Sequence, residues 1–396
     1  MTTQKVYIFS NGCSRRLLDG KRLKDFFVQN GWQVVNSNQT ANLVVLNTCG
    51  LTQEGIDYAE SLIIQNQKLG KKILLCGCVP KIKPNLLKKH RIESFFSPSN
   101  FSKINQIIHP RITKIEKLDD HNLLTFEDVS TYTKSYLSNN LPKLLANLLF
   151  KKNKKTAFYL RISNGCNFNC SYCGIKKAVG KLKSKPLKTC VNELKKGIKA
   201  NHYNIIITAE DVGGYGRDLN ITFPELLQAV INTDSKKKLK IYIQELHPYW
   251  LIFYQKELAK LLKRKQIIRI MCPIQSGSEK ILKQMKRPYK IKPFKKTVKL
   301  LRRSFPGIEL ETHIIVGFPG ETEKDFNKTL NLLTEVGFLN VSFFPYQEND
   351  QTKSKKYPNK VNKKTIQKRI AQATKFCQQN NIHIVNPDDW LFPPFH

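Results

Sequence analysis

Short apolar runs alternate with longer amphipathic stretches over residues 5–110. The runs are Val6–Phe9, Trp32–Val35, Leu43–Leu46, Ile73–Leu75 and Ser94–Phe96. Residues 17–30 and 52–69 lie between them and carry apolar residues at helical spacing. Such alternation predicts a parallel sheet with helices on both faces, and a near-continuous run such as LVVL suits a strand buried on both sides. We therefore predict an α/β fold whose N-terminal part is a doubly wound parallel sheet.

A second alternating series extends from Phe158 to about residue 346. Its predicted strands are Tyr159–Ile162, Ile205–Thr208, Ile241–Gln244, Ile268–Cys272, Glu311–Ile315 and Asn340–Phe344. The predicted helices are 189–200, 223–232, 255–263, 278–285, 293–303 and 321–337. Six consecutive strand–helix units predict a partial (βα)6 barrel, and functional groups of such barrels collect where the strands end.

The alternation weakens between the two series and again after the second. We expect the domain boundaries to be 1–110 for the N-terminal sheet, 111–155 for a linker with one helix at 141–150, 156–346 for the barrel, and 347–396 for a basic C-terminal extension. One helix is expected at 363–379 in this extension, followed by a short tail from Asn380. The sequence shows no internal repeats.

The charge balance bears on the partner. Sixty-seven Lys and Arg residues against 30 Asp and Glu residues give a formal net charge of +37. This excess favours a polyanion, with nucleic acid as the first candidate, and the alternative is a lysine-rich solvated surface. Hydrophobic residues make up 40% of the chain, so it can bury a core and is not disordered as a whole. With no apolar run near the ~20 residues of a membrane span and no signal-peptide layout, we expect a soluble cytoplasmic protein with no membrane partner.

Three cysteines form the sharpest local motif. Cys166, Cys170 and Cys173 stand in a C-x3-C-x2-C pattern directly after the first predicted barrel strand. Three thiolates on one tight loop can hold three irons of a four-iron cluster and leave the fourth iron open for a reactant. The alternative is a zinc knuckle that lacks one ligand. The position at the carboxyl end of a barrel strand favours the catalytic interpretation.

A second set of cysteines is spread along the N-terminal part. Cys13 follows the first predicted strand, Cys49 the third and Cys78 the fourth. Because the carboxyl ends of parallel strands lie at one edge of a sheet, we expect the three thiols to meet there and to hold a second cluster with its own open iron. The alternative is three ordinary half-buried cysteines.

The motifs together resemble the methylthiotransferases among the radical S-adenosylmethionine enzymes. The resemblance covers residues 1 to about 375 and rests on the GC…NTC…GC cysteines followed by four segments. These are AFYLRISNGCNFNCSYC (157–173), TAEDVGGYGRDL (208–219), CPIQSGSEKILKQMKRPY (272–289) and HIIVGFPGETEKDF (313–326). In the sequence of these segments the chain is most similar to the enzymes that act on threonylcarbamoyladenosine in tRNA. It differs from them in ending soon after the barrel, where the family carries a small RNA-binding β-barrel, and in lacking a family proline near Lys176.

The resemblance implies two 4Fe–4S clusters and S-adenosylmethionine as cofactors. It further implies that one S-adenosylmethionine methylates a sulfur on the N-terminal cluster and that a second yields a radical that abstracts hydrogen from an unactivated C–H bond, at which the methylthio group is inserted. The implied partners are tRNA and an electron donor of the reductase or flavodoxin type. Tyr172, just before the third cysteine, is expected against the adenine of S-adenosylmethionine, where an aromatic face stacks well.

Further candidates lie at predicted strand ends. Glu210 and Asp211 are carboxylates that can accept hydrogen bonds from the ammonium group of S-adenosylmethionine, the alternative being a glycine-rich turn. Gln275 and Ser276 are expected to point to the mouth of the barrel as cofactor ligands. Lys286 and Arg287 resemble a basic pair near the substrate, the alternative being a solvated helix end.

The other cysteines and two histidines are expected to be structural. We assign Cys76, Cys190, Cys272 and Cys377 to the core or surface, with Cys76 facing away from Cys78, and we treat His247 and His313 as core histidines. Three other functions stay open at this point. They are the same chemistry on a peptide or protein side chain, a radical enzyme that does not methylthiolate, and a non-catalytic zinc or iron–sulfur RNA-binding protein.

Overall fold

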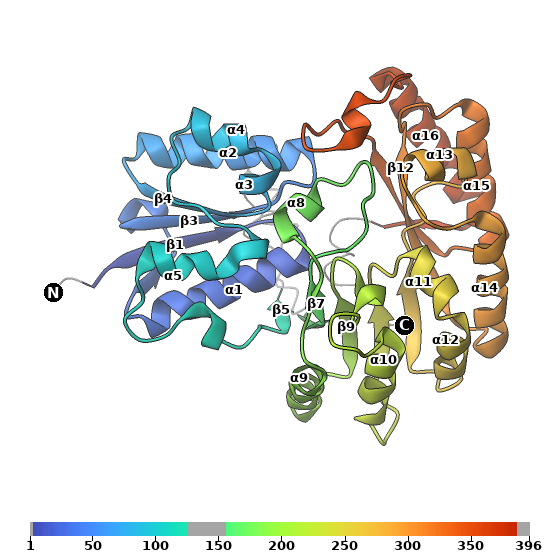
Figure 1. Ribbon diagram of the computed structural model, residues 1–396, viewed down its shortest axis with the longest axis horizontal. Helices are drawn as coiled ribbons and strands as arrows, with labels where there is room; N and C mark the ends of the chain where they lie inside the picture. Colours follow the sequence, from blue (N-terminus) through green and yellow to red (C-terminus); the bar gives the residue numbers. More distant parts are fainter. Residues whose placement is uncertain (1–2, 126–127, 129–155, 386–396) are drawn as a thin grey trace. The chain divides into compact units, whose positions relative to one another are not determined.

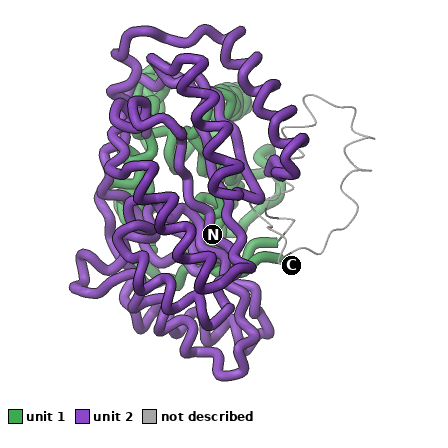
Figure 2. Tube along the Cα trace, turned by 90° about the vertical axis from the view of Figure 1, so that its right-hand side faces the viewer, with its two compact units in different colours: residues 1–159, 174–180 green, residues 160–173, 181–396 purple. Residues whose placement is uncertain are grey.

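The computed structural model describes residues 3–125, 128 and 156–385. The chain forms two compact units, shown in different colours in Figure 2. The first contains residues 1–159 and 174–180, and the second contains residues 160–173 and 181–396. The chain therefore enters the second unit, returns briefly to the first after Cys173, and leaves it again.

The first unit is built on a four-stranded parallel sheet. Its strands are β1 (Lys5–Ser10), β2 (Gln33–Val35), β3 (Leu43–Thr48) and β4 (Lys72–Gly77), in the order β2-β1-β3-β4. All of the pairs are parallel. Leu46 of the central strand β3 and Leu75 of β4 are fully buried, as expected for a sheet covered on both faces.

Two helices cover opposite faces of this sheet (Figure 1). Helix α1 (Ser14–Gln29) buries Leu23, Phe26 and Phe27 in one apolar core. Helix α2 (Gln53–Lys68) places Ile56, Ala59 and Ile63 in a second core on the other face. The predicted doubly wound sheet is thus confirmed.

Smaller elements complete the first unit. They are α3 (Val79–Ile82), α4 (Pro84–Lys89), η1 (Asn38–Thr40), η2 (Pro98–Lys103), α5 (Ile104–Ile108), η3 (Ile115–Lys117), β5 (Leu123–Thr125) and α8 (Ile175–Val179). Strand β5 pairs antiparallel with residues 156–158. The strand predicted at Ser94–Phe96 is instead a single parallel bridge between Leu75 and Phe95. Helix α8 belongs here because Ala178 and Val179 lie in the core of the α2 face.

The second unit carries a parallel sheet whose strand order follows the sequence. From β6 (Thr156–Arg161), which begins in the first unit, the strands are β9 (Asn204–Thr208), β10 (Lys240–Ile243), β11 (Ile267–Met271), β12 (Glu309–Val316), β13 (Asn340–Pro345) and β14 (His383–Ile384). The helices are α9 (Leu187–Lys199), α10 (Phe223–Asn232), α11 (Pro248–Phe253), α12 (Gln255–Leu262), α13 (Glu279–Gln284), α14 (Ile291–Ser304), α15 (Glu323–Val336) and α16 (Lys363–Gln379). This is the predicted partial barrel, with the helix expected at 255–263 preceded by the extra helix α11.

Short elements occupy the connections of the partial barrel. β7 (Ser163–Asn164) and β8 (Lys183–Ser184) form a small antiparallel pair on either side of the cysteine loop, and η4 (Val212–Gly214) and η5 (Lys353–Lys356) follow β9 and β13. Capping boxes fix where two of the helices begin. The Thr322 hydroxyl accepts a hydrogen bond from the Asp325 N–H, and the Thr322 N–H donates to the Asp325 carboxylate. Thr222 and Glu225 form the same pair of hydrogen bonds at α10.

Two expectations fall outside the described residues. The linker helix at 141–150 and the tail from residue 386 onward are among the residues that the structure does not describe. Within residues 3–125 and 156–385, no helix is long and apolar enough to cross a membrane.

Candidate metal centres

The loop that carries Cys166, Cys170 and Cys173 follows β6 and β7 in the second unit. Gly165 begins it with a φ of 84°, and a Cβ at this position would overlap the carbonyl oxygen of Lys181. Only glycine fits so close an approach at positive φ. The Gly165 N–H donates to Oε2 of Glu210 at 2.9 Å, which ties the start of the loop to the end of β9.

The second half of the loop is held from two other segments. Ser171 donates its N–H to the Met285 carbonyl at 3.0 Å and its hydroxyl to the Gln284 carbonyl at 2.8 Å. The Ser171 carbonyl accepts the N–H of Ser354 at 3.0 Å. Residues remote in the sequence therefore fix the loop at the carboxyl ends of the strands.

The three thiols suit an iron cluster. Burial, the Asp211 carboxylate and the neighbouring cysteines all raise the pKa of Cys166, so its thiolate needs a positively charged partner. The three cysteines are partly exposed, which leaves them accessible. In the described parts of the chain, no three His, Cys, Asp or Glu side chains converge closely enough to hold one metal ion. Ligands of a four-iron cluster bind separate irons and need not converge on one point, so this donor set fits such a cluster.

Cys13, Cys49 and Cys78 follow three adjacent strands of the first sheet. Cys13 comes after β1, Cys49 directly after β3 and Cys78 directly after β4, and these strands are neighbours in the order β1-β3-β4. A Cβ on Gly12 would lie 3.2 Å from the Cys49 sulfur, so the first two loops touch. The Cys78 N–H donates to the Thr48 carbonyl at 2.8 Å. The structure thus places the three cysteines after the carboxyl ends of neighbouring strands, and their role as ligands of one cluster stays a prediction.

The charge around the second set is positive. Burial and nearby Cys13 raise the pKa of Cys49 to about 11, although the Leu51 N–H and the guanidinium groups of Arg16 and Arg15 act to lower it. Arg16 is buried and forms a 2.8 Å ion pair with Asp19. Helix α1 begins just after Cys13, so its positive dipole end lies there too. The two guanidinium groups near Cys49 and the start of α1 suit a ligand set that carries thiolate charge, and the residues fit a second cluster.

Three polar residues lie just beyond neighbouring barrel strands. Asp211 follows β9, His247 follows β10 and Gln275 follows β11. Asp211 accepts a hydrogen bond from the Trp250 indole at 2.9 Å, and burial raises its pKa to about 7. His247 Nε2 and Gln275 Oε1 are buried and have no hydrogen-bond partner among the described residues. Buried polar atoms are normally hydrogen-bonded, and the polar groups of S-adenosylmethionine can supply the hydrogen-bond partners.

The other predicted cofactor residues have different surroundings. Tyr172 packs edge-on against Phe318 with ring centroids 6.5 Å apart. Glu210 is occupied by the Gly165 N–H described above. Ser276 is fully buried, accepts the Ser278 N–H at 3.2 Å and lies 3.4 Å from the Thr329 hydroxyl of α15. Ser276 therefore packs against α15, whereas its role as a cofactor ligand stays a prediction.

The two residues of the predicted basic pair, Lys286 and Arg287, differ in their exposure to solvent. Lys286 is exposed, with a φ of 57°. Arg287 is buried, and its guanidinium donates to the Pro273 carbonyl, to the Tyr172 hydroxyl at 3.3 Å and to the Cys170 sulfur at 3.9 Å. Arg287 thus touches the cysteine loop itself, while Lys286 faces solvent.

An aromatic cluster beside the cysteine loop was missed by the sequence analysis. Phe168, between the first two cysteines, stacks on His247 with centroids 3.9 Å apart and the rings inclined by 14°. Trp250 packs edge-on against Phe168 at 6.0 Å. Burial keeps the pKa of His247 well below its usual range, so the ring is neutral. The HPYW sequence after β10 was the available signal for this cluster.

The remaining cysteines are buried, as expected. Cys76, Cys190, Cys272 and Cys377 are each at most 1% exposed. Cys76 lies in the α1-side core and Cys78 in the α2-side core, which confirms that they face opposite sides of the sheet.

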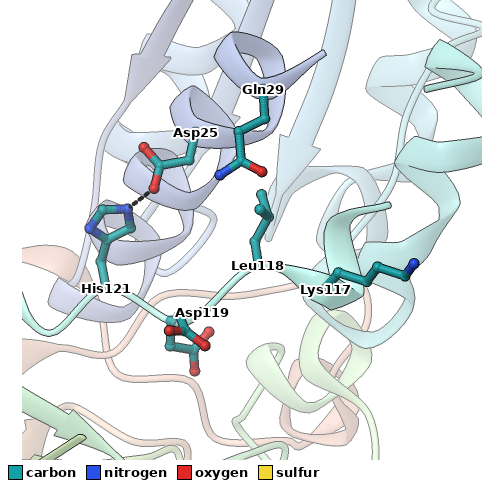
Figure 3. Close-up of a pocket in the computed structure, with 7 residues that line it drawn as sticks. Asp25, Gln29, Lys117, Leu118, Asp119 and His121 are labelled. Atoms are coloured by element: carbon teal, nitrogen blue, oxygen red, sulfur yellow. Dashed lines mark hydrogen bonds and ion pairs between the residues drawn. The ribbon is translucent and has the colours of Figure 1, made fainter. Parts of the chain in front are cut away.

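A pocket in the first unit contains no cysteine. Figure 3 shows Asp25, Gln29, Lys117, Leu118, Asp119 and His121 around it, together with Asp120. His121 contacts Asp25 at 2.7 Å, and Asp120 pairs with Arg22 at 3.1 Å. These two acidic groups thus have partners within the first unit.

Comparison with known proteins agrees with this arrangement. The model of the radical SAM superfamily matches residues 160–333, and the model described as uncharacterized protein family UPF0004 matches residues 5–97. A Methanocaldococcus jannaschii protein named as a probable threonylcarbamoyladenosine tRNA methylthiotransferase is 30% identical over 335 residues, 84% of this chain and 73% of that protein. The chain belongs to the radical S-adenosylmethionine methylthiotransferase family.

Two further comparisons concern the share of a relative's length that the chain covers and the similarity of its fold to a solved structure. The human threonylcarbamoyladenosine tRNA methylthiotransferase is 29% identical over 368 residues, which are 91% of this chain but only 61% of the human protein. The solved structure of a radical S-adenosylmethionine methyltransferase, TsrM from Kitasatospora setae, has a TM-score of 0.62 at 13% identity and covers 89% of this chain and 77% of its own. This likeness shows the fold.

Proposed function

We propose that the protein inserts a methylthio group at an unactivated C–H bond of an adenosine in tRNA, with N6-threonylcarbamoyladenosine as the leading substrate. The observation that carries the proposal is the pair of three-cysteine sets, each at the carboxyl edge of a parallel sheet, in a chain of the methylthiotransferase family. One set alone would serve a radical enzyme that leaves sulfur transfer to another protein.

Each set has its own role in this proposal. Cys166, Cys170 and Cys173 hold one 4Fe–4S cluster, and Cys13, Cys49 and Cys78 hold the other. When bound, the two clusters and S-adenosylmethionine supply the sulfur, the methyl group and the radical that removes hydrogen. An electron donor of the reductase or flavodoxin type supplies the electrons.

The chain's own residues bind and orient these groups. Asp211, His247 and Gln275 present buried polar atoms for the amino, carboxylate and ribose groups of S-adenosylmethionine. Nδ1 of the neutral His247 ring accepts the Tyr249 N–H at 3.0 Å, so Nε2 carries the proton and donates. Arg287 places positive charge beside Cys170 and holds the Tyr172 hydroxyl, which orients that ring. The aromatic cluster of Phe168 and Trp250 keeps water from one side of the loop.

The net charge of +37 supports tRNA as the substrate, because phosphate contacts dominate the affinity of proteins for nucleic acid. The names of the relatives from M. jannaschii and human point to the same substrate. We place the reaction in the cytoplasm, where tRNA is available. An acidic peptide is the competing substrate for a basic enzyme, and the product analysis below separates the two.

The test compares modified nucleosides of total tRNA by mass spectrometry in cells with and without the gene. We expect one methylthio-adenosine species to disappear, and to return when the gene or its Cys377→Ala variant is restored, because Cys377 is buried in α16 and belongs to neither set. The Cys170→Ala variant should not restore it. An unchanged tRNA nucleoside profile after deletion would rule out the tRNA substrate.

A further inference from the structure

The segment that follows β13 is a basic arm docked on the cysteine loop. We call residues 346–360 the arm; it includes η5 and appears in orange-red before α16 in Figure 1. Its anchor is Ser354, which is fully buried and donates its N–H to the Ser171 carbonyl at 3.0 Å. The Tyr346 hydroxyl donates to the Ser354 hydroxyl at 2.9 Å, and the Asn359 carbonyl accepts the Gly320 N–H at 2.8 Å. The arm is thus a fixed part of the barrel mouth.

The same loop residue is held by a second basic segment. Ser171 also bonds to Gln284 and Met285 at the end of α13, where Lys283 and Lys286 are exposed. The Tyr357 hydroxyl of the arm donates to the Gln284 carbonyl at 3.4 Å. Two lysine-bearing segments therefore meet at the residue between Cys170 and Tyr172.

The ion pairs divide the arm's lysines into two kinds. Lys355 pairs with Asp350, and Lys360 pairs with Glu348 at 2.7 Å, so these charges are compensated. Lys353 and Lys356 are exposed and form no ion pair within the part of the chain that the structure describes. These two exposed charges beside the cysteine loop are therefore available to an anion.

We propose that Lys353 and Lys356 of the arm, with Lys283 and Lys286, form a lysine rim that binds the phosphates of an RNA strand on either side of the target base. This inference rests on the proposed function. A base that reacts within the barrel mouth must leave its stack, so the backbone around it stays at the rim of the mouth. The half-buried Tyr346 and Tyr357 lie in the same segment, and a mixture of aromatic and basic groups is typical of surfaces for unpaired nucleic acid.

The test compares two double variants with equal charge loss. Lys353→Ala/Lys356→Ala removes the arm's half of the rim. Lys236→Ala/Lys237→Ala is the matched control, because these exposed lysines lie in the turn before β10, at the opposite end of the strands from the cysteine loop. Each is compared with the wild-type chain for binding of unmodified tRNA over a series of salt concentrations.

For the rim variant we expect the slope of log Kd against log salt to fall by about 1.4–1.8, since each lost phosphate contact contributes about 0.7–0.9. The control should keep the wild-type slope, and both variants should keep the wild-type melting temperature. Equal slopes for the rim variant and the wild type, or equal losses in both variants, would overturn the rim while leaving the proposed function intact. A wild-type chain that does not bind tRNA, or that prefers polyglutamate to tRNA, would instead refute the tRNA substrate and the rim with it.

Discussion

Gly165 is the position in the cysteine loop where a single substitution should disturb the fold most. Its φ of 84° costs about 1–2 kcal/mol for any residue with a Cβ, and the Cβ of an alanine would overlap the backbone oxygen of Lys181. The Lys181 backbone cannot move aside as easily as the end of a flexible side chain. Relieving such an overlap costs about 1–3 kcal/mol. We therefore expect Gly165→Ala to destabilise the second unit by about 2–5 kcal/mol.

Gly320 provides a matched control in the same unit. Its φ is 81°, and the nearest atoms to an added Cβ belong to the flexible end of the Gln284 side chain at 3.2 Å. Gly320→Ala should thus lose only the ~1–2 kcal/mol of the backbone conformation. The difference between the two variants isolates the overlap with Lys181.

The assay is urea unfolding of the metal-free chain followed by tryptophan fluorescence, since Trp250 lies beside the loop. A second readout is iron content after anaerobic reconstitution, where Gly165→Ala should lose the iron of the Cys166 set and Gly320→Ala should not. Equal unfolding midpoints and equal iron in the two variants would refute the claim that close packing at Gly165 positions the cysteines.

Two other predictions concern the chemistry and the core. Cys170→Ala should abolish cleavage of S-adenosylmethionine to 5′-deoxyadenosine. Cys49→Ala should still release 5′-deoxyadenosine, but mass spectrometry should detect no methylthio product. A Cys49 variant that still methylthiolates would disprove the role of its set. Burial raises the pKa of Glu311 from 4.5 to about 7, so its folded state prefers the protonated form and loses up to about 3 kcal/mol as pH rises from below 4.5 to above 7. Glu311→Gln, which can still accept the Tyr242 hydroxyl, should remove that part of the pH dependence in unfolding experiments, and an unchanged pH profile would contradict it.

The two sheets could be predicted from the sequence because buried parallel strands consist of short runs of apolar residues. Leu43–Leu46 and Ile205–Thr208 became strands close to their expected bounds. The cysteine positions followed from the same reasoning, since strand ends meet at one edge. Ser94–Phe96 failed as a strand because three apolar residues fix a buried segment without fixing how many backbone pairs it makes.

Contacts between remote residues could not be predicted in this way. Ser354 touches Ser171 across more than 180 positions, and His247 stacks on Phe168 from another strand end. Lys286 and Arg287 are adjacent in sequence, yet the positive φ at Lys286 accompanies an exposed first side chain and a buried second one. Such outcomes depend on the packing of the whole barrel mouth.

The central claim is that two separate cysteine sets each hold a four-iron cluster, and iron content tests it most directly. After anaerobic reconstitution, the wild type and the Cys377→Ala control should each contain about eight irons per chain. Cys49→Ala and Cys170→Ala should each contain about four. A wild-type chain with only about four irons, or a Cys49 variant that keeps all of them, would contradict the account.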